Sequence, residues 1–240
     1  MDLKKYTDLA RKALKLRPCG AVIVAAGSAS RMGGIDKVMA QLHGEPMIVH
    51  TARAFQNCEA IREIVIVTRE DLIAPIMELC KDFDKVKAVV LGGASRQESV
   101  GNGLSMLSGE MELAAVQDGA RPLVTDAVID RVVRAANSYA AAIPVIPVKD
   151  TIKVCPAGLV ESTPDRAQLR AVQTPQVFDI DLLRVALANA EEKELAVTDD
   201  CSAVEQLGMK VKAVEGDEFN LKVTTPIDLR IAELLMEERK

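Results

Sequence analysis

A glycine-rich segment with two cationic side chains follows the first short apolar run of the chain. The apolar run spans residues 21–24, and the segment spans residues 25–37, with Arg31 and Lys37 as its cations. Glycine has no Cβ atom, so a polyphosphate can lie directly against the backbone N–H groups of such a turn. Arginine adds a planar fork of donors, and lysine adds a compact charge. These residues favour a triphosphate-binding loop, and the alternative is a turn that is glycine-rich for packing reasons alone.

The spacing within this segment excludes two common nucleotide-binding patterns. Its glycines stand at positions 27, 33 and 34, which does not match Gly-x-Gly-x-x-Gly. Lys37 is not followed by Ser or Thr, as the phosphate-binding loop of many nucleotide hydrolases requires. The first mismatch disfavours a dinucleotide-dependent oxidoreductase.

Asp118 directly follows a mostly apolar segment, residues 113–117. If that segment is a strand, the carboxylate stands at its carboxyl end, where open α/β sheets bind their ligands. Mg²⁺ prefers one or two carboxylates together with phosphate oxygens and water. Asp118 is therefore the best candidate for a metal ligand, and the alternative is that it caps the segment that follows. The positions of Arg166 and Lys222 in the sequence, taken alone, predict only that they are cations on the protein surface.

A second glycine turn, Gly92-Gly93-Ala94, precedes a predicted helix that contains Ser99. Small residues there leave room for a pyrimidine ring and would crowd a purine. Exposed backbone groups of this turn, together with those of Ala25 and Ala26, can read the edge of a base. A serine near the start of a helix is otherwise a local cap.

Composition excludes several classes of protein. The net charge of −5 and the aromatic content of 2% argue against a nucleic-acid binder. With only two histidines, a histidine-based zinc site or a Ser-His-Asp triad is improbable. The five cysteines are scattered, as in a protein of the reducing cytosol. No signal peptide or apolar run near the ~20 residues of a membrane span is present, so we expect a soluble, cytoplasmic protein.

Strands and helices alternate in the predicted element order. Apolar runs predict strands at residues 21–24, 62–68, 87–91, 113–117 and 142–148. Amphipathic stretches predict the intervening helices at residues 46–56, 71–80, 95–107 and 126–141. This order predicts a Rossmann-like, doubly wound, mostly parallel α/β sheet with right-handed crossovers.

The remaining segments are expected to form additions to this sheet within one domain, residues 1–240. Residues 1–19 form a helical extension, and residues 149–176 form a β-arm whose hairpin pairs residues 151–155 with residues 159–162. The exposed edges of such an arm can be covered by a second copy of the chain. The carboxyl-terminal part adds helices at residues 180–192, 201–207 and 226–238 and short strands at residues 209–214 and 220–223.

The loop pattern Ala-Ala-Gly-x-x-x-Arg-Met, with a lysine shortly after, resembles the signature of the sugar-phosphate nucleotidyltransferases. Further motifs, in order along the chain, are similar to those of the 2-C-methyl-D-erythritol 4-phosphate cytidylyltransferases of isoprenoid precursor synthesis. They are residues 92–100 (GGASRQESV), 118–122 (DGARP), 147–151 (PVKDT), 174–176 (TPQ), 198–200 (TDD) and 220–224 (NLKVT). The resemblance runs from about Gly20 to the carboxyl terminus.

This resemblance implies an enzyme that joins CTP to a polyol phosphate and releases pyrophosphate. Its catalytic residues are implied to be Arg31 and Lys37 on the nucleotide's phosphates, and Arg166 and Lys222 on the acceptor's phosphate. Asp118 is implied to bind Mg²⁺, and the arm is implied to form a homodimer. The implied CTP-binding residues are Ala25, Ala26, Gly27, Gly92, Gly93, Ser99 and Asp118, and the implied acceptor-site residues are Arg121, Thr151 and Thr174.

Three positions depart from the family pattern. Asp36 replaces the usual proline before the loop lysine, Ala94 stands where an acidic residue is common, and Phe219 precedes Asn220 where a carboxylate is frequent. The segment 33–37 is also similar to that of nucleotidyltransferases that load molybdenum cofactors. The alternatives are a ribitol-5-phosphate cytidylyltransferase, which shares nearly all the motifs, and a non-catalytic nucleotide-binding module.

Overall fold

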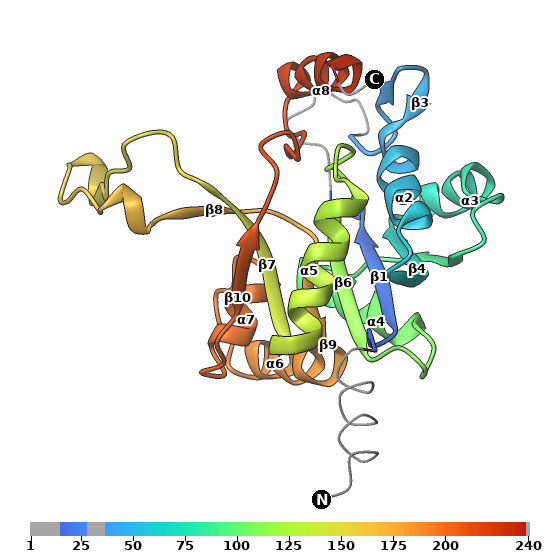
Figure 1. The fold of residues 1–240 in the computed structure, drawn as a ribbon, viewed down its shortest axis with the longest axis horizontal. Helices are drawn as coiled ribbons and strands as arrows, with labels where there is room; N and C mark the ends of the chain where they lie inside the picture. Colours follow the sequence, from blue (N-terminus) through green and yellow to red (C-terminus); the bar gives the residue numbers. More distant parts are fainter. Residues whose placement is uncertain (1–14, 28–36, 239–240) are drawn as a thin grey trace, which may run out of the picture.

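The computed structural model describes residues 15–27 and 37–238, and its centre is a mixed β-sheet (Figure 1). In the described residues the sheet has eight strands, in the order β10-β7-β9-β6-β1-β4-β5, with β8 paired to β7. The strands are β1 (Cys19–Val24), β4 (Ile61–Thr68), β5 (Val86–Leu91), β6 (Leu113–Asp118), β7 (Ala141–Pro147), β8 (Arg170–Val172), β9 (Gln176–Asp179) and β10 (Lys212–Glu215).

Most neighbouring strands of the sheet run parallel. β1 pairs in parallel with both β4 and β6, β4 pairs in parallel with β5, and β10 pairs in parallel with β7. β9 runs antiparallel to β6 and β7, and β8 runs antiparallel to β7. The predicted α/β class with a mostly parallel sheet is confirmed. β8 and β9 were not predicted.

Helices cover both faces of the sheet, because the apolar side chains of the central strands alternate between the two sides. Ala21 and Ile23 of β1 belong to one buried cluster, and Val22 belongs to the other. The first cluster packs against α2 (Met47–Asn57), α3 (Glu70–Leu79) and α5 (Asp126–Tyr139). The second packs against α4 (Arg96–Met106), α6 (Ile180–Glu192) and α7 (Asp200–Glu205).

A third apolar cluster joins the carboxyl-terminal helix to a small hairpin. The hairpin is β2 (Gln41–Leu42) and β3 (Glu45–Pro46), and the helix is α8 (Pro226–Glu238). The helix begins as predicted: Thr225 Oγ1 accepts a hydrogen bond from Asp228 N at 3.3 Å, and Asp228 Oδ2 accepts one from Thr225 N at 2.8 Å. Figure 1 shows α8 and this hairpin near each other at one end of the sheet.

The segment that follows β7 extends away from the sheet as an arm (Figure 1). Its two sides meet at one antiparallel bridge, Val154 with Ser162, on either side of a short 3₁₀ helix, η1 (Pro156–Gly158). A second 3₁₀ helix, η2 (Arg166–Gln168), follows before the chain returns as β8. The predicted hairpin is therefore present in position, but its pairing is limited to a single bridge.

Several predicted boundaries need correction. Residues 220–223 are not a strand, because their backbone donors bond to loops and not to a β ladder: Asn220 N donates to Asp217 O and Val223 N donates to Ala120 O, both at 2.9 Å. α5 ends at Tyr139, since Ala140 has a φ of 64°. Most of the predicted amino-terminal helix lies outside the described residues. None of the helices in the described part of the chain has the length and apolar character that a membrane span requires.

Candidate active site

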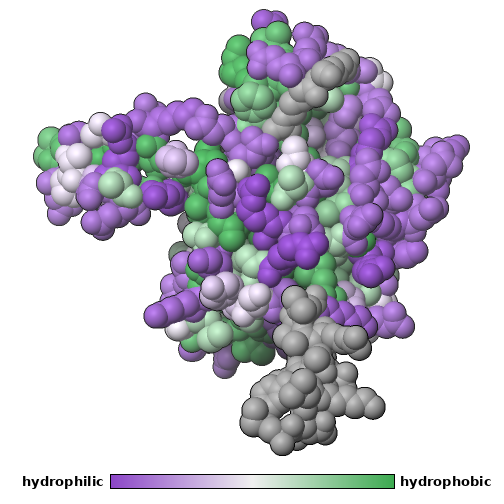
Figure 2. Space-filling model, in the orientation of Figure 1, coloured by the Kyte–Doolittle hydropathy of each residue, from purple (hydrophilic) through white to green (hydrophobic). Residues whose placement is uncertain are grey.

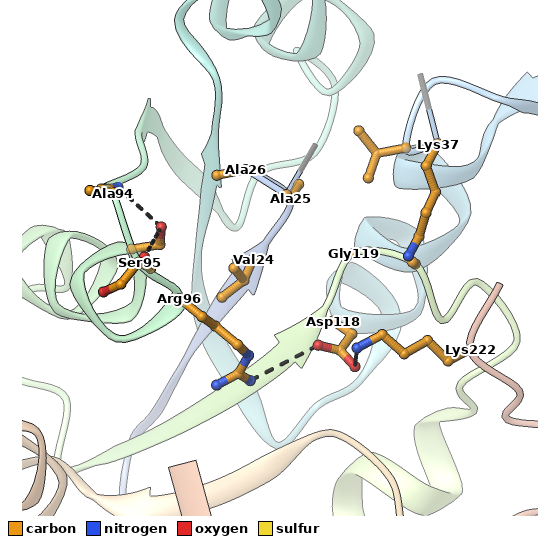
Figure 3. Close-up of a pocket in the computed structure, with 15 residues that line it drawn as sticks. Val24, Ala25, Ala26, Lys37, Ala94, Ser95, Arg96, Asp118, Gly119 and Lys222 are labelled. Atoms are coloured by element: carbon orange, nitrogen blue, oxygen red, sulfur yellow. Dashed lines mark hydrogen bonds and ion pairs between the residues drawn. The ribbon is translucent and has the colours of Figure 1, made fainter. Parts of the chain in front are cut away.

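A cleft of about 480 Å³ lies at the carboxyl ends of β1 and β6. Its walls come from residues 24–27 at the end of β1, residues 93–96 and Ser99 at the start of α4, and residues 118–120 at the end of β6. Lys37 and Lys222 enter it from two further segments (Figure 3). Open α/β sheets bind ligands at this edge, so the cleft is the candidate active site.

The cleft collects most of the residues that the sequence singled out. Its lining includes eight of them: Ala25, Ala26, Gly27, Lys37, Gly93, Ser99, Asp118 and Lys222. Arg121 and Thr174 are buried just outside the lining and contact Asp118. Gly92 borders the cleft through Ala26 and Ser99. Arg31 lies outside the described residues.

Asp118 is at the centre of a cluster of charges. Its Oδ2 atom lies 2.8 Å from Lys222 Nζ and 3.4 Å from Arg121 Nε, and its Oδ1 atom lies 3.9 Å from a terminal nitrogen of Arg96. Burial alone would raise the pKa of the Asp118 carboxyl. The three neighbouring cations outweigh that effect and hold the pKa below its ordinary value, so the group is ionised at neutral pH.

Hydrogen bonds tie Asp118 to two loops that are distant in the sequence. Asp118 N donates to Thr174 Oγ1 at 3.1 Å, and Arg121 donates to the carbonyl of Asn220 at 2.6 Å. The loop anchored by Asn220 carries Lys222, which therefore reaches the cleft from a fixed base. Thr174 and Arg121 therefore help to fix the positions of Asp118 and Lys222.

The second glycine turn is held by its own polar side chains. Gly93 N donates to Ser99 Oγ at 3.0 Å, and Ser99 Oγ donates to Ser95 O at 2.9 Å. The N-cap of α4 is Ser95, whose Oγ accepts from Glu98 N at 3.0 Å. Ser99 therefore braces the turn and also lines the cleft, while the helix cap that the sequence raised as an alternative role for it is Ser95.

Close packing keeps this turn against the first glycine loop. A Cβ atom on Gly92 would lie 2.5 Å from the Cβ atom of Ala26 and 3.0 Å from Ser99 Oγ. Only a glycine fits between these two neighbours. The backbones of the two loops consequently face the same part of the cleft.

Arg96 and Asp200 were quoted in motifs but were given no role from the sequence. Arg96 is the first residue of α4 and lines the cleft, and its guanidinium lies 2.7 Å from Asp200 Oδ2. The Asp200 side chain is fully buried, and that burial raises the pKa of its carboxyl in spite of the Arg96 charge. Two features of the sequence could have drawn attention to this pair: Arg96 directly follows the glycine turn and its serine cap, and Asp200 belongs to an acidic pair at the start of a helix.

Arg166 and Thr151 lie on the exposed arm, outside the cleft of their own chain. An Arg166 nitrogen donates to the carbonyl of Lys149 at 2.7 Å, at the base of the arm. The structure therefore does not bring these two predicted residues to Asp118 within one chain.

The described residues contain no group of three or more His, Cys, Asp or Glu side chains that could hold a metal by themselves. Asp118 presents one ionised carboxylate to the cleft, and the other charged side chains of the described lining are the cations Lys37, Arg96 and Lys222. This donor set fits Mg²⁺ that takes its other ligands from phosphate oxygens and water. It does not fit a structural metal such as tetrahedral Zn²⁺.

The same pattern of sequence and fold occurs in known proteins. A sequence model of the family described as 2-C-methyl-D-erythritol 4-phosphate cytidylyltransferase matches residues 19–238. A protein of that name from Bacillus mycoides is 45% identical over 222 residues, covering 91% of this chain and 98% of the relative. One from Caldanaerobacter subterraneus is 43% identical over 227 residues, covering 91% of this chain and 98% of the relative.

Solved structures agree with the sequence comparison. The 4-diphosphocytidyl-2C-methyl-D-erythritol synthase of Anaerococcus prevotii superposes with a TM-score of 0.85 at 29% identity, covering 94% of this chain and 99% of that one. The 2-C-methyl-D-erythritol 4-phosphate cytidylyltransferase of Thermus thermophilus gives a TM-score of 0.73 at 33% identity, covering 92% and 99%.

Proposed function

The chain belongs to the 2-C-methyl-D-erythritol 4-phosphate cytidylyltransferase family, and from this premise we propose how its residues divide the work of the reaction. The enzyme joins CTP and 2-C-methyl-D-erythritol 4-phosphate in isoprenoid precursor synthesis. A phosphate oxygen of the acceptor attacks the α-phosphorus of CTP. The bond to the β-phosphate breaks, pyrophosphate leaves, and 4-diphosphocytidyl-2-C-methyl-D-erythritol is formed.

The observation that carries the assignment of roles is the cluster of cations around Asp118, beside two glycine turns in one cleft. Nucleotidyl transfer needs two anions held in line and a donor for each charge that develops. The cleft offers these groups, and its described lining contains no histidine or cysteine. The reaction is therefore supported mainly by position and charge.

The nucleotide is placed by the two glycine turns. The base lies against residues 92–94 and the backbone of Ala25 and Ala26, and the triphosphate extends from Gly27 toward Lys37. Lys37, together with Arg31, neutralises charge on the phosphates as the α-phosphorus is attacked. Removal of one preorganised donor from such a site costs on the order of 3 kcal/mol of barrier.

Asp118 would hold Mg²⁺ with oxygens of the triphosphate, and the ion would offset the charge on the departing pyrophosphate. Lys222 pairs with Asp118 in this structure, at 2.8 Å. In the complex with substrate, Lys222 turns to the acceptor's phosphate. Its side chain is 42% exposed, so it has room to do so.

We assign the arm to a homodimer interface. Leu159 and Val160 near its tip are 76% and 65% exposed, and Figure 2 shows hydrophobic surface on the arm. A second copy would cover this surface. In such a dimer Arg166 and Thr151 complete the acceptor site of the partner subunit, which explains why they lie outside their own cleft. Residues 1–240 then form one nucleotidyltransferase domain with this arm as an insert.

The deciding assay measures pyrophosphate release from CTP with each polyol phosphate in turn. We expect turnover with 2-C-methyl-D-erythritol 4-phosphate and little with ribitol 5-phosphate, because the relatives carry the first activity in their names. Turnover should require Mg²⁺ and should be lost in Asp118→Asn. A preference for ribitol 5-phosphate would contradict the acceptor, and full activity of Asp118→Asn would contradict the proposed site.

A further inference from the structure

A chain of ion pairs leads from the cleft to the buried start of α7. Arg96 stands between Asp118 at 3.9 Å and Asp200 at 2.7 Å. Figure 3 shows the Arg96 side chain leaving α4 and pointing across the cleft toward Asp118. Its side chain is 29% exposed, whereas that of Asp200 is 0% exposed. Arg96 can therefore touch a ligand in the cleft, and Asp200 can act only through Arg96.

The charged side chains around the cleft include more cations than carboxylates, which favours the binding of an anion. Asp118 and Asp200 face three close cations: Lys222, Arg121 and Arg96. Within residues 15–27 and 37–238, Arg96 is bonded tightly to one carboxylate, that of Asp200, because its 3.9 Å distance to Asp118 exceeds a hydrogen bond. The guanidinium fork thus keeps donors for a second anion beside Asp118.

Asp200 is held firmly in its place. Asp199 and Ser202 form a capping box at the start of α7, which fixes the backbone on both sides of Asp200. Gln176 of β9 adds to this, since its Nε2 donates to Asp199 Oδ2 at 2.6 Å and its Oε1 accepts from Cys201 N at 2.9 Å. These contacts fix the backbone around Asp200, and the Asp200 carboxylate therefore meets the Arg96 guanidinium from a fixed base, at 2.7 Å.

A purely structural purpose does not account well for this pair. Burying a carboxylate is costly, and a buried ion pair often stabilises a fold no better than apolar residues of the same volume. α4 and α6–α7 already share an apolar cluster that includes Val100, Leu104 and Val204. A pair whose arginine reaches the cleft is better explained by a ligand.

We propose that Arg96 is a further substrate-binding residue, whose guanidinium contacts the α-phosphate of the nucleotide, and that Asp200 is the residue that positions it. The inference rests on the proposed placement of the nucleotide, because the α-phosphate must lie near Asp118 for Arg96 to reach it. It assigns a role to a fully buried acidic residue on an element that does not itself line the cleft.

The test compares equilibrium binding of CMP and cytidine by calorimetry in the absence of metal. The variants are Arg96→Gln, Asp200→Asn and the double variant. Loss of a hydrogen bond to a charged group predicts CMP binding weaker by about tenfold or more in Arg96→Gln, with cytidine binding unchanged. Asp200→Asn should weaken CMP binding in the same direction, and the double variant should bind CMP no worse than Arg96→Gln alone.

Two controls separate position from stability. Asp179→Asn removes the negative charge that pairs with Arg17 at 2.8 Å outside the cleft, and it should leave CMP binding unchanged. Arg96→Lys keeps the charge without the fork and should recover only part of the CMP affinity. Thermal unfolding of each variant shows whether it is folded, and Arg96→Gln alone decides the outcome if Asp200→Asn does not fold.

The inference is overturned if Arg96→Gln binds CMP as the wild type does, or if CMP and cytidine lose affinity equally. It is also overturned if Asp200→Asn lowers the thermal midpoint and leaves CMP binding unchanged, since Asp200 would then be structural. A wild-type protein that binds neither CMP nor CTP would contradict the proposed function itself.

Discussion

Substitution of Gly92 by alanine tests whether the two glycine turns together form the nucleotide's binding surface. The new methyl group would lie 2.5 Å from the Cβ atom of Ala26, whereas ordinary contact begins near 3.4 Å. One of the turns must therefore move by about 1 Å. Ser99 Oγ, at 3.0 Å from the same methyl group, leaves little space on the other side.

The expected consequences differ in size for stability and for catalysis. Overpacking of this kind typically costs about 1–3 kcal/mol of unfolding free energy. For a chain of this length that corresponds to a lower thermal midpoint by roughly 2–4 °C for each kcal/mol. A displacement of about 1 Å in a positioned substrate can lower the rate by on the order of 10²-fold. We therefore expect Gly92→Ala to fold and to lose most of its kcat/KM for CTP.

Gly101→Ala is the matched control, because a Cβ atom on Gly101 of α4 meets nothing within 4 Å. Alanine in a helix interior should stabilise the protein by about 0.5–1 kcal/mol without changing the kinetics. Steady-state kinetics with CTP varied, together with thermal unfolding, measure both effects. Wild-type kcat/KM in Gly92→Ala would refute the placement of the base, and an equal loss in Gly101→Ala would refute the packing argument.

Three further predictions concern separate parts of the molecule. Lys37→Ala should lower kcat with little change in the KM for CTP, and Arg166→Ala should raise the KM for the polyol phosphate. Steady-state kinetics with each substrate varied separately measure both effects. A change confined to the CTP parameters in Arg166→Ala, or to the polyol phosphate parameters in Lys37→Ala, would show that the two substrates are misplaced. Deletion of residues 155–159 should weaken both self-association and turnover in sedimentation and activity assays, and a fully active monomeric wild type would contradict the dimer. Asp179 caps α6 and pairs with Arg17, and although burial acts to raise the pKa of its carboxyl, these contacts hold the pKa below the ordinary 3.8. Asp179→Ala should therefore lower the unfolding free energy by about 1 kcal/mol above pH 3.8. The difference in unfolding free energy between variant and wild type should narrow as the pH falls below that value. Unfolding measured at several pH values that showed a pH-independent difference would contradict this reasoning.

The central strands and the cleft were predictable because their signals are local. β1 and β4 are buried on both faces, which produces continuous apolar runs. Parallel strands end at one edge of the sheet, so the residues just after β1 and β6 had to meet. This rule alone predicts that Asp118 and the loops beside it lie at the same edge of the sheet.

The parts that could not be predicted depend on contacts between distant segments. β9 has only four residues and begins with Gln176, whose buried amide donates to Asp199, the N-cap of α7, and accepts from Cys201 N. Residues 220–223 resemble a strand in their pattern, but their hydrogen bonds go to loops. The pairing of Arg96 with Asp200 joins positions 104 residues apart (200 − 96), and no periodicity in either segment indicates it.

The reversed strand β9 has a consequence for the order in which the sheet can be completed during synthesis on the ribosome. β6 is covered by β1 on one side as soon as both have emerged, but its other neighbour is β9. β9 begins 58 residues after β6 ends (176 − 118), which at about 5–20 residues per second leaves that edge of β6 open for roughly 3–12 s. Lys222 emerges later still, so a nascent chain carries Asp118 at an incomplete edge until nearly the whole protein has been made.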